Sequence, residues 1–335
     1  MTPAQHSTLY KRPIVVLIVL ACLAPASIVL ALNLGSVPIS MLDWLHIFND
    51  SRDQLPLEVI LQLRLPRTLS AFVTGGQLAL AGVLMQVLLR NPLADPYILG
   101  ISGGAAVAAL LAMLAGLSGY MLTGSAFLGA LLSMFLVFSI AHGQGSWTPT
   151  RLLLTGVVIA AGWGAIISFI LSVSPERNLH SMLFWLMGDL SYAPAPTHSA
   201  VILLLGLLLS GYFAKSLNIL ARSELIAESL GVAVAQLRIK IYLLASVITA
   251  VAVTTAGSIA FIGLITPHLL RLSGVHDHRF LIPASVLLGG VILVLADAVA
   301  RTWLAPQQLP VGVITALIGV PLFLFLMYKS ASSLS

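Results

Sequence analysis

The sequence predicts an all-α integral membrane protein of about ten transmembrane helices. Hydrophobic residues make up 59% of the 335 residues, charged residues make up 8%, and the mean hydropathy is +1.05. Soluble domains carry about 25% charged residues, so this chain has too little charge to cover a surface that faces water. Apolar stretches of roughly the 20 residues that a spanning helix needs recur along the chain. One membrane domain over residues 1–335 is therefore expected.

Nine apolar segments are long enough, or nearly so, to cross a bilayer as helices. They cover residues 14–34, 69–89, 97–117, 121–141, 152–172, 198–217, 241–262, 280–300 and 311–328. Two shorter stretches, 179–190 and 263–273, lie between them. We expect 263–273 to be a short tenth spanning helix that is buried inside the bundle, because a segment this short cannot cross lipid alone. Residues 179–190 are expected to form a partial or re-entrant helix.

The first apolar run could belong either to a signal peptide or to a retained helix. Lys11 and Arg12 precede it, and Ala24-Pro25-Ala26 superficially resembles a cleavage site. The apolar core of a signal peptide is usually about 7–15 residues long, and residues 14–34 form a longer run. We therefore expect an uncleaved first helix.

The distribution of Lys and Arg predicts the orientation in the membrane. With ten spans and a cytoplasmic N-terminus, eleven basic residues fall in cytoplasmic segments and five in outer segments. The cytoplasmic set is Lys11, Arg12, Arg90, Arg151, Lys215, Arg222, Arg238, Lys240, Arg271, Arg279 and Lys329. The outer set is Arg52, Arg64, Arg67, Arg177 and Arg301. Cytoplasmic loops carry the excess of positive charge in membrane proteins, so both termini are expected in the cytoplasm. The net charge of +5 therefore calls for no nucleic-acid partner.

The longest strongly polar stretch is residues 221–240. Arg222, Glu224 and Glu228 fall at helical spacing within it, and Gly231 is a natural helix stop. Apolar residues gather on one helical face there, namely Leu225, Ile226 and Leu230. We expect two short amphipathic helices with a glycine corner on the cytoplasmic side, and a solvated loop is the alternative.

Two patterns associated with catalysis occur outside their required context. Residues 100–104 match G-x-S-x-G, which needs a strand before it and a helix after it, but they lie near the start of an apolar helix. Gly206 and Gly211 have phosphate-loop spacing, yet Tyr212 and Phe213 stand where Gly-Lys-Ser/Thr should begin. No catalytic residue and no nucleotide site are therefore expected in this chain.

The ionisable residues leave two further questions. His268, His276 and His278 cluster around one cytoplasmic turn without an HExxH motif or a nearby cysteine, so no metal site is expected. Asp297 is the one carboxylate well inside an apolar segment. An acid within the membrane is a functional candidate by default, but Arg301 lies one helical turn later and can simply pair with it.

Three stretches carry distinctive motifs in a fixed order. The first contains Arg64-Leu65-Pro66-Arg67, Gly82-Val83-Leu84-Met85-Gln86, Asn91-Pro92-Leu93-Ala94-Asp95-Pro96 and Leu99-Gly100-Ile101-Ser102-Gly103-Gly104; the second runs from Gly257 to His268, with Arg271; the third runs from Asp297 to Pro321 and includes Leu309-Pro310-Val311-Gly312. Together with the hydropathy pattern, they resemble the FecCD/BtuC-type permease family. Members of this family are the membrane subunits of ABC importers for iron–siderophore complexes, haem and cobalamin. The resemblance runs nearly end to end and implies a BtuC-like permease bundle.

The resemblance also implies partners. A family permease works as a dimer with two cytoplasmic ATPase subunits and a periplasmic substrate-binding protein, in the bacterial inner membrane. A homodimer is expected here, and a different second permease is the alternative. The chain itself would hold no cofactor, because ATP and Mg would be bound by the ATPase. The stretch 221–240 is similar to the coupling segment that contacts the ATPase, with Arg222, Glu224, Glu228, Leu230, Gly231 and Arg238 as its candidate residues.

Two further sets of residues match family positions. Arg64, Arg67 and Arg301 match those that pair with glutamates on the binding protein, for which guanidinium groups are well suited. The alternative is that these arginines merely extend from helix ends to the membrane interface. Asn91, Leu93 and Thr150 match positions near the cytoplasmic gate of the pathway. Turn chemistry explains the Asn-Pro sequence equally well.

The expected function is therefore import of a bulky metal chelate, with energy from a separate ATPase and no chemistry in this chain. A ferric siderophore is the first expectation for the cargo, and cobalamin, another corrinoid or haem are the alternatives. A secondary transporter driven by an ion gradient is the alternative from another class. It would need ionisable residues paired at mid-membrane, and only Asp297 is near such a position.

Overall fold

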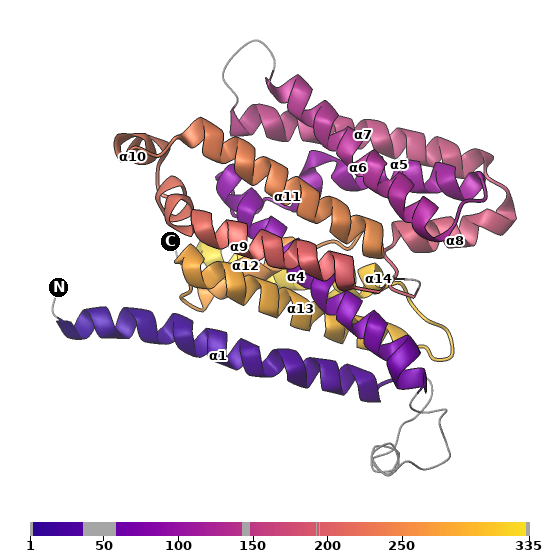
Figure 1. Cartoon of the computed structure of the whole chain (residues 1–335), viewed down its shortest axis with the longest axis horizontal. Coiled ribbons are helices and arrows are strands. Elements are labelled where there is room, and N and C mark those ends of the chain that lie inside the picture. Colours follow the sequence, from indigo (N-terminus) through magenta and orange to yellow (C-terminus); the bar gives the residue numbers. More distant parts are fainter. Residues whose placement is uncertain (1–2, 36–57, 143–147, 192, 194, 333–335) are drawn as a thin grey trace.

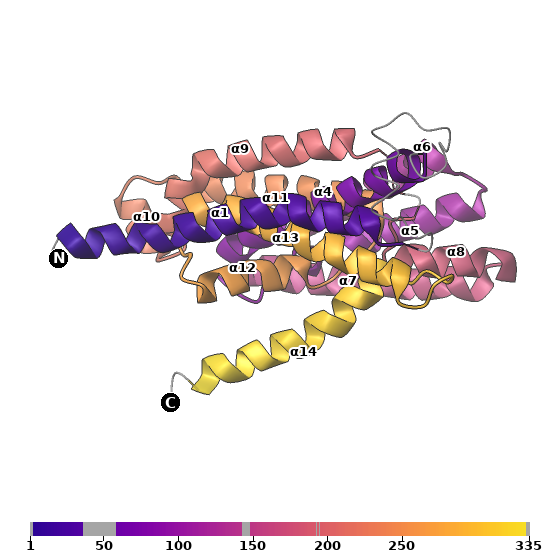
Figure 2. The ribbon, with the colours of Figure 1, turned by 90° about the horizontal axis from the view of Figure 1, so that it is seen from below.

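Helices make up all the secondary structure in the part of the chain that the computed structural model describes, which is residues 3–35, 58–142, 148–191, 193 and 195–332. In chain order they are α1 (Pro3–Asn33), the π-helix η1 (Val59–Arg64), α4 (Leu65–Leu88), the 3₁₀-helix η2 (Pro96–Leu99), α5 (Ile101–Leu114), α6 (Gly119–His142), α7 (Pro149–Val173), α8 (Glu176–Leu186), α9 (Thr197–Leu220), α10 (Glu224–Ser229), α11 (Val234–Ala256), α12 (Ile262–Leu272), α13 (His278–Thr302) and α14 (Val311–Ser332). Most of the long helices run in roughly the same direction (Figure 1), whereas α14 diverges from the rest of the bundle (Figure 2).

Ten of the described segments are candidates for crossing a membrane. Seven helices are long and apolar enough to do so by length and composition, counting η1 and α4 together. Three shorter apolar helices, α5, α12 and the first part of α14, bring the number to ten. α8 has 11 residues, as expected for the partial helix. The predicted all-α membrane fold of about ten helices is confirmed.

Close contacts between glycines place α4 in the interior of the bundle, where nearly all of its residues are buried. Gly75 faces Gly289 of α13, and Gly82 faces Gly263 of α12. A Cβ atom added at Gly75 or Gly82 would collide with the opposite carbonyl oxygen. In lipid there is no hydrophobic drive between helices, so this close approach supplies van der Waals attraction instead. The small residues at these positions therefore serve to pack helices together.

α12 is the short segment that was expected to be buried, and it is. Residues from Ile262 to Pro267 are all buried, as is Leu270. α12 packs against α4 and α13, so other helices rather than lipid surround most of it. The unpaired backbone N–H and C=O groups at the ends of α12 therefore need not face the hydrocarbon. A helix of only 11 residues can lie within the membrane only when these groups are shielded in this way.

Several segments differ from the expected boundaries, and two of the differences are informative. Residues 97–117 are interrupted by Gly100, which has a left-handed φ of +69°, so that η2 precedes a short α5. The segment expected at 241–262 begins earlier, at Val234, and ends at Ala256. The second of the two short helices expected within 221–240 is consequently the start of the long α11. Its first turns are polar because they extend beyond the apolar part of the same helix.

α1 is an integral part of the bundle. It runs along α13 (Figure 1), and Leu20, Ala24, Ser27 and Ala31 bury one face of it. The opposite face exposes Val15, Ile18 and other apolar side chains, as expected for a helix in contact with lipid. α1 therefore packs with one face on the bundle and exposes the other, and its retention stays a prediction.

Candidate functional site

The candidate residues lie at opposite ends of the bundle. α10 lies near the N- and C-terminal ends of the chain, whereas the start of α4 and the end of α13 lie at the far end (Figure 1). Arg64, Arg67 and Arg301 belong to that far end. The opposite placement of the arginines and of segment 221–240 agrees with the expected topology, in which they face different sides of the membrane.

The centre of the far end is a forked ion pair between Arg67 of α4 and Asp297 of α13. Arg67 Nε donates to Asp297 Oδ1 at 3.0 Å, and Nη2 donates to the same oxygen at 2.8 Å. Nε also lies 3.2 Å from Oδ2. The Asp297 side chain is only 1% exposed and that of Arg67 only 11%. A planar guanidinium fixes a carboxylate in such a fork far better than an ammonium group could.

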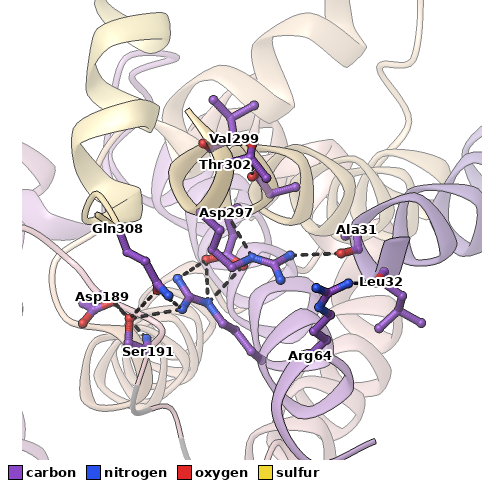
Figure 3. A network of polar contacts seen from close by, with 12 residues as sticks. Ala31, Leu32, Arg64, Asp189, Ser191, Asp297, Val299, Thr302 and Gln308 are labelled. Atoms are coloured by element: carbon purple, nitrogen blue, oxygen red, sulfur yellow. Dashed lines mark hydrogen bonds and ion pairs between the residues drawn. The ribbon is translucent and has the colours of Figure 1, made fainter. Parts of the chain in front are cut away.

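Arg301 and Arg64 complete this arginine–aspartate network and attach it to α1. Arg301 Nε lies 3.0 Å from Asp297 Oδ2, and its Nη2 donates to the carbonyl oxygen of Ala31 at 3.2 Å. Arg64 Nη1 donates to the carbonyl oxygen of Leu32 at 2.8 Å (Figure 3). Helix C-terminal carbonyls have no partner within their own helix. The two arginines therefore satisfy the end of α1 and hold it against α4 and α13.

The third nitrogen of Arg67 has only neutral partners. Arg67 Nη1 donates to Gln308 Oε1 at 2.7 Å and to Ser191 Oγ at 3.1 Å. Ser191 Oγ in turn donates to Asp189 Oδ1 at 2.7 Å (Figure 3). Gln308 precedes α14, and Ser191 follows α8, and both are exposed. The network thus runs from a fully buried carboxylate to the surface.

The pairing of Asp297 with Arg301 is confirmed, and the pairing with Arg67 was missed. The first partner lies four residues away on the same helix, so helical spacing reveals it. The second lies 230 residues away in sequence. Charge could have revealed this second partner. One intramembrane acid and three arginines were expected on the same side of the membrane, and buried charges are normally paired.

At the opposite end, Glu224 and Arg238 form a second fork. Arg238 Nη1 and Nη2 donate to Glu224 Oε1 and Oε2 at 2.8 and 2.7 Å. The Arg238 side chain is 7% exposed and that of Glu224 is 33% exposed, while Arg90 lies 3.9 Å from the same carboxylate. Gly231, with φ +78°, makes the expected corner between α10 and α11. The fork therefore fastens α10 to the long helix that follows it.

The remaining candidates of segment 221–240 form an exposed surface on α10. Glu228, Leu230 and Arg222 are all exposed. Leu225 is 78% exposed and Ile226 is 49% exposed, so the apolar face expected here points away from the bundle. Exposed leucines beside charged groups, at an end of the bundle that reaches beyond the apolar spans, are typical of a protein contact surface.

The three gate candidates are only partly brought together. Asn91 Oδ1 accepts a hydrogen bond from the backbone N–H of Leu93 at 2.9 Å, which is an Asx turn. Leu93 is 37% exposed. Thr150 is exposed in the first turn of α7, and no hydrogen bond between described residues joins it to the other two. Turn chemistry thus accounts for the local geometry, and a gating role stays a prediction.

Of the three histidines that were expected to cluster around one turn, His278 contacts a neighbouring helix. His278 Nδ1 lies 2.7 Å from Asn218 Oδ1, and Asn218 Nδ2 donates to Asp277 Oδ1 at 2.7 Å, which joins α9 to the start of α13. The expected cluster of three histidines therefore includes at least one that packs helices. Within the described ranges, no group of three His, Cys, Asp or Glu side chains is placed to hold a metal ion.

Comparison with known proteins gives closely related permeases. The model of the FecCD transport family matches residues 20–329. The hemin transport system permease protein HmuU of Yersinia pestis is 38% identical over 316 residues, covering 90% of this chain and 92% of that protein. The vitamin B12 import system permease protein BtuC of Salmonella typhi is 37% identical over 325 residues, covering 96% and 97%.

The fold has a close match among solved structures. A structure described as an inward-facing conformation of a metal-chelate type ABC transporter has a TM-score of 0.83 to this chain at 34% sequence identity. The match covers 93% of this chain and 98% of that one. Sequence and structure therefore agree on similarity to transport permeases over nearly the whole length.

Proposed function

The chain belongs to the FecCD transport family of ABC importer permeases, and on this premise we propose how it assembles and what it carries. It pairs with a second permease, which we take to be an identical copy, and with two cytoplasmic ATPase subunits that bind ATP and Mg. A periplasmic binding protein delivers the cargo. Both termini and α10 face the cytoplasm, and the arginine–aspartate network faces the periplasm. Light scattering of the purified complex would show one permease per particle if the pairing were incorrect.

The proposed cargo is a metal tetrapyrrole, haem or a cobalamin. The observation that carries this is the pair of named relatives, a hemin permease and a vitamin B12 permease, each similar over at least 90% of this chain. The relatives therefore favour a tetrapyrrole over the ferric siderophore that was the first expectation from the sequence. The pathway must pass a bulky solute without holding it tightly, so the binding protein supplies most of the selectivity.

Uptake into liposomes tests the cargo and the energy source together. Permease, ATPase and binding protein are reconstituted, and uptake of hemin, cyanocobalamin and a ferric siderophore is measured with ATP inside. ATP-dependent uptake of hemin or cobalamin, with little uptake of the siderophore, is the expected result. Siderophore uptake would overturn the cargo assignment. Uptake driven by an ion gradient without an ATPase would overturn the importer class for this chain.

We propose that the network receives the binding protein, chiefly through Arg67. Both oxygens of Asp297 are already held by arginines. The Nη1 atom of Arg67, however, has the neutral partners Ser191 and Gln308, which are exposed. A carboxylate on the binding protein would replace these neutral partners with a charged one and so form a stronger hydrogen bond. Arg64 and Arg301 would contribute to the positive field around the site.

Arg67→Gln is the variant that tests this docking role. It should weaken binding of the loaded binding protein by more than about 1 kcal/mol, roughly fivefold, and the loss should be larger at low salt because screening already reduces exposed charge pairs. Charge reversal would be a poor test, since a glutamate at this position would face Asp297. Arg177→Gln, on the exposed surface of α8 at the same end, is the matched control. Equal binding by both variants at every salt concentration would remove Arg67 from the docking surface.

We propose that α10 contacts the ATPase, with two distinct roles for its glutamates. Glu228 is exposed and free to meet the ATPase, whereas Glu224 holds α10 to Arg238. Glu228→Ala should weaken stimulation of ATP hydrolysis by the loaded binding protein while the melting temperature stays unchanged. Glu224→Ala should lower both this stimulation and the melting temperature, because α10 loses its attachment to α11.

The proposed cytoplasmic gate keeps its three candidate residues, Asn91, Leu93 and Thr150.

Reconstituted ATPase activity and thermal unfolding in detergent together measure the two roles. Glu176→Ala, an exposed glutamate on α8 at the other end of the bundle, is the control for general effects of losing a carboxylate. If Glu228→Ala couples normally, the ATPase contact lies elsewhere on the chain. If Glu224→Ala melts at the same temperature as the unaltered protein, the fork does not hold α10 in place.

A further inference from the structure

A basic groove lies beside α10, between α9, α11 and the start of α13. Its volume is about 830 Å³. The side chains of Lys215, Lys240 and Arg279 reach it from three different helices. Its other lining residues are Gly211, Tyr212, Phe213, Ala214, Ser216, Gly231, Val232, Ala233, Gln236 and Leu237. The lining contains three cations and no acidic residue.

Within the described part of the chain, no carboxylate neutralises the two lysines of this groove. None of Lys215, Lys240 and Arg279 makes an ion pair with a described carboxylate. The nearest acid in sequence is Asp277, two residues before Arg279. Its Oδ1 already accepts hydrogen bonds from Asn218 Nδ2 at 2.7 Å and from the backbone N–H of Arg279 at 2.9 Å, so it caps α13. The groove therefore retains at least two uncompensated lysines.

The aromatic side chains of this groove fit a position at the level of lipid headgroups. Lys240 Nζ lies 5.8 Å above the ring of Phe213, and Tyr212 is 81% exposed. Tyrosines and other amphipathic rings gather where a membrane meets water. Gly211 and Gly231 add no side chain to the lining, and nothing lies within 4 Å of a Cβ atom built at either position. A headgroup therefore has open access from the side.

The surface next to the groove is apolar in the direction of the membrane interior. On α9, one to two turns before Tyr212, the exposed side chains are Leu204, Leu205, Leu208 and Leu209. Leu243 on α11 continues the same kind of surface one turn after Lys240. Cations at the interface followed by exposed leucines match the two parts of a phospholipid, a charged headgroup and its acyl chains. A free phosphate ion would use only the first part.

We propose that this groove binds the phosphate of an anionic phospholipid, whose acyl chains lie along the exposed leucines of α9. Each Lys or Arg near an anionic headgroup contributes about 1 kcal/mol of attraction. The bound lipid would lie against Gly231 and Val232, the residues that connect α10 to α11. The proposal does not depend on the identity of the cargo.

Native mass spectrometry of the purified permease tests the proposal. Phosphatidylglycerol and phosphatidylcholine with the same acyl chains are added in detergent, and the bound lipids are counted on the unaltered chain and on Lys215→Gln/Lys240→Gln. The control variant is Arg12→Gln/Arg151→Gln, which also loses two exposed charges on the expected cytoplasmic side. The unaltered chain and the control should retain phosphatidylglycerol in preference to phosphatidylcholine. The lysine variant should bind phosphatidylglycerol about thirtyfold more weakly.

Three outcomes would overturn the proposal. One is equal retention of the two lipids by the unaltered chain, and another is an equal loss in both variants, because either means that the groove is not selective. The third is displacement of phosphatidylglycerol by inorganic phosphate at equal concentration, which would assign the groove to a free anion. All four substituted residues are exposed, so both variants should melt at the temperature of the unaltered chain.

Discussion

Asp297→Asn should lower the stability of the permease more than any other single removal of charge. It leaves Arg67 and Arg301 as buried cations that have lost their common carboxylate. Breaking a buried pair by removing one partner costs about 3–5 kcal/mol, because the remaining charge stays away from water without compensation. The expected result is a much lower melting temperature in detergent and loss of the folded species on size-exclusion chromatography.

A second substitution separates charge from packing. Asp297→Asn combined with Arg301→Gln removes one of the two stranded cations, so it should recover part of the lost stability. Asp189→Asn is the control, because Asp189 touches the same network only through Ser191 at its exposed edge. Its cost should be near 1 kcal/mol, the usual contribution of one hydrogen bond. If Asp297→Asn melts like the unaltered protein, the network does not stabilise this end of the bundle.

Gly82→Ala is the second change with a large expected effect. A methyl group at this position would overlap the carbonyl oxygen of Gly263, so α4 and α12 would have to separate. Adding a methylene to a packed core typically costs about 1–3 kcal/mol, and more where backbone must move. Because α12 is short and held mainly by its neighbours, we expect little folded protein. Expression with a fluorescent tag, followed by size-exclusion chromatography, measures this yield.

Gly124→Ala provides the matched control on α6. Nothing lies within 4 Å of a Cβ atom built there, and the residue is exposed. Alanine is favoured over glycine in a helix by up to about 1 kcal/mol, so the yield of this variant should equal or exceed that of the unaltered chain. Similar yields for Gly82→Ala and Gly124→Ala would mean that the contact between α4 and α12 tolerates expansion.

The sequence predicts the helices well because hydropathy sums over about 20 residues, so single errors average out. It predicts their interruptions poorly. Gly100 and Gly257 both have a φ of +69°; Gly100 separates η2 from α5 and Gly257 ends α11, each inside a stretch that was expected to form one helix. Hydropathy also says nothing of where a helix continues through polar residues, which is why α11 begins at Val234 rather than at residue 241.

The candidate sites show the same limit. The arginines at one end and the segment 221–240 at the other were identified from motifs, and the structure places them at opposite ends. Their partners on other helices were not identified: Arg67 and Asp297 lie on different helices, as do Glu224 and Arg238. Spacing along one helix reveals pairs such as Asp297 and Arg301, whereas pairs between helices depend on how the bundle packs.

The fork between Glu224 and Arg238 has a mechanical consequence. It joins α10 to α11, a rod of 23 residues that is about 35 Å long. At the far end of this rod, Gly257 lies against the backbone carbonyl of Trp185 with no room for a side chain. Trp185 lies six residues before Ser191, a partner of Arg67. Continuous contacts therefore connect α10, through the rigid α11, to the segment that carries Ser191, and we expect a displacement of α10 to be transmitted to the opposite end of the bundle.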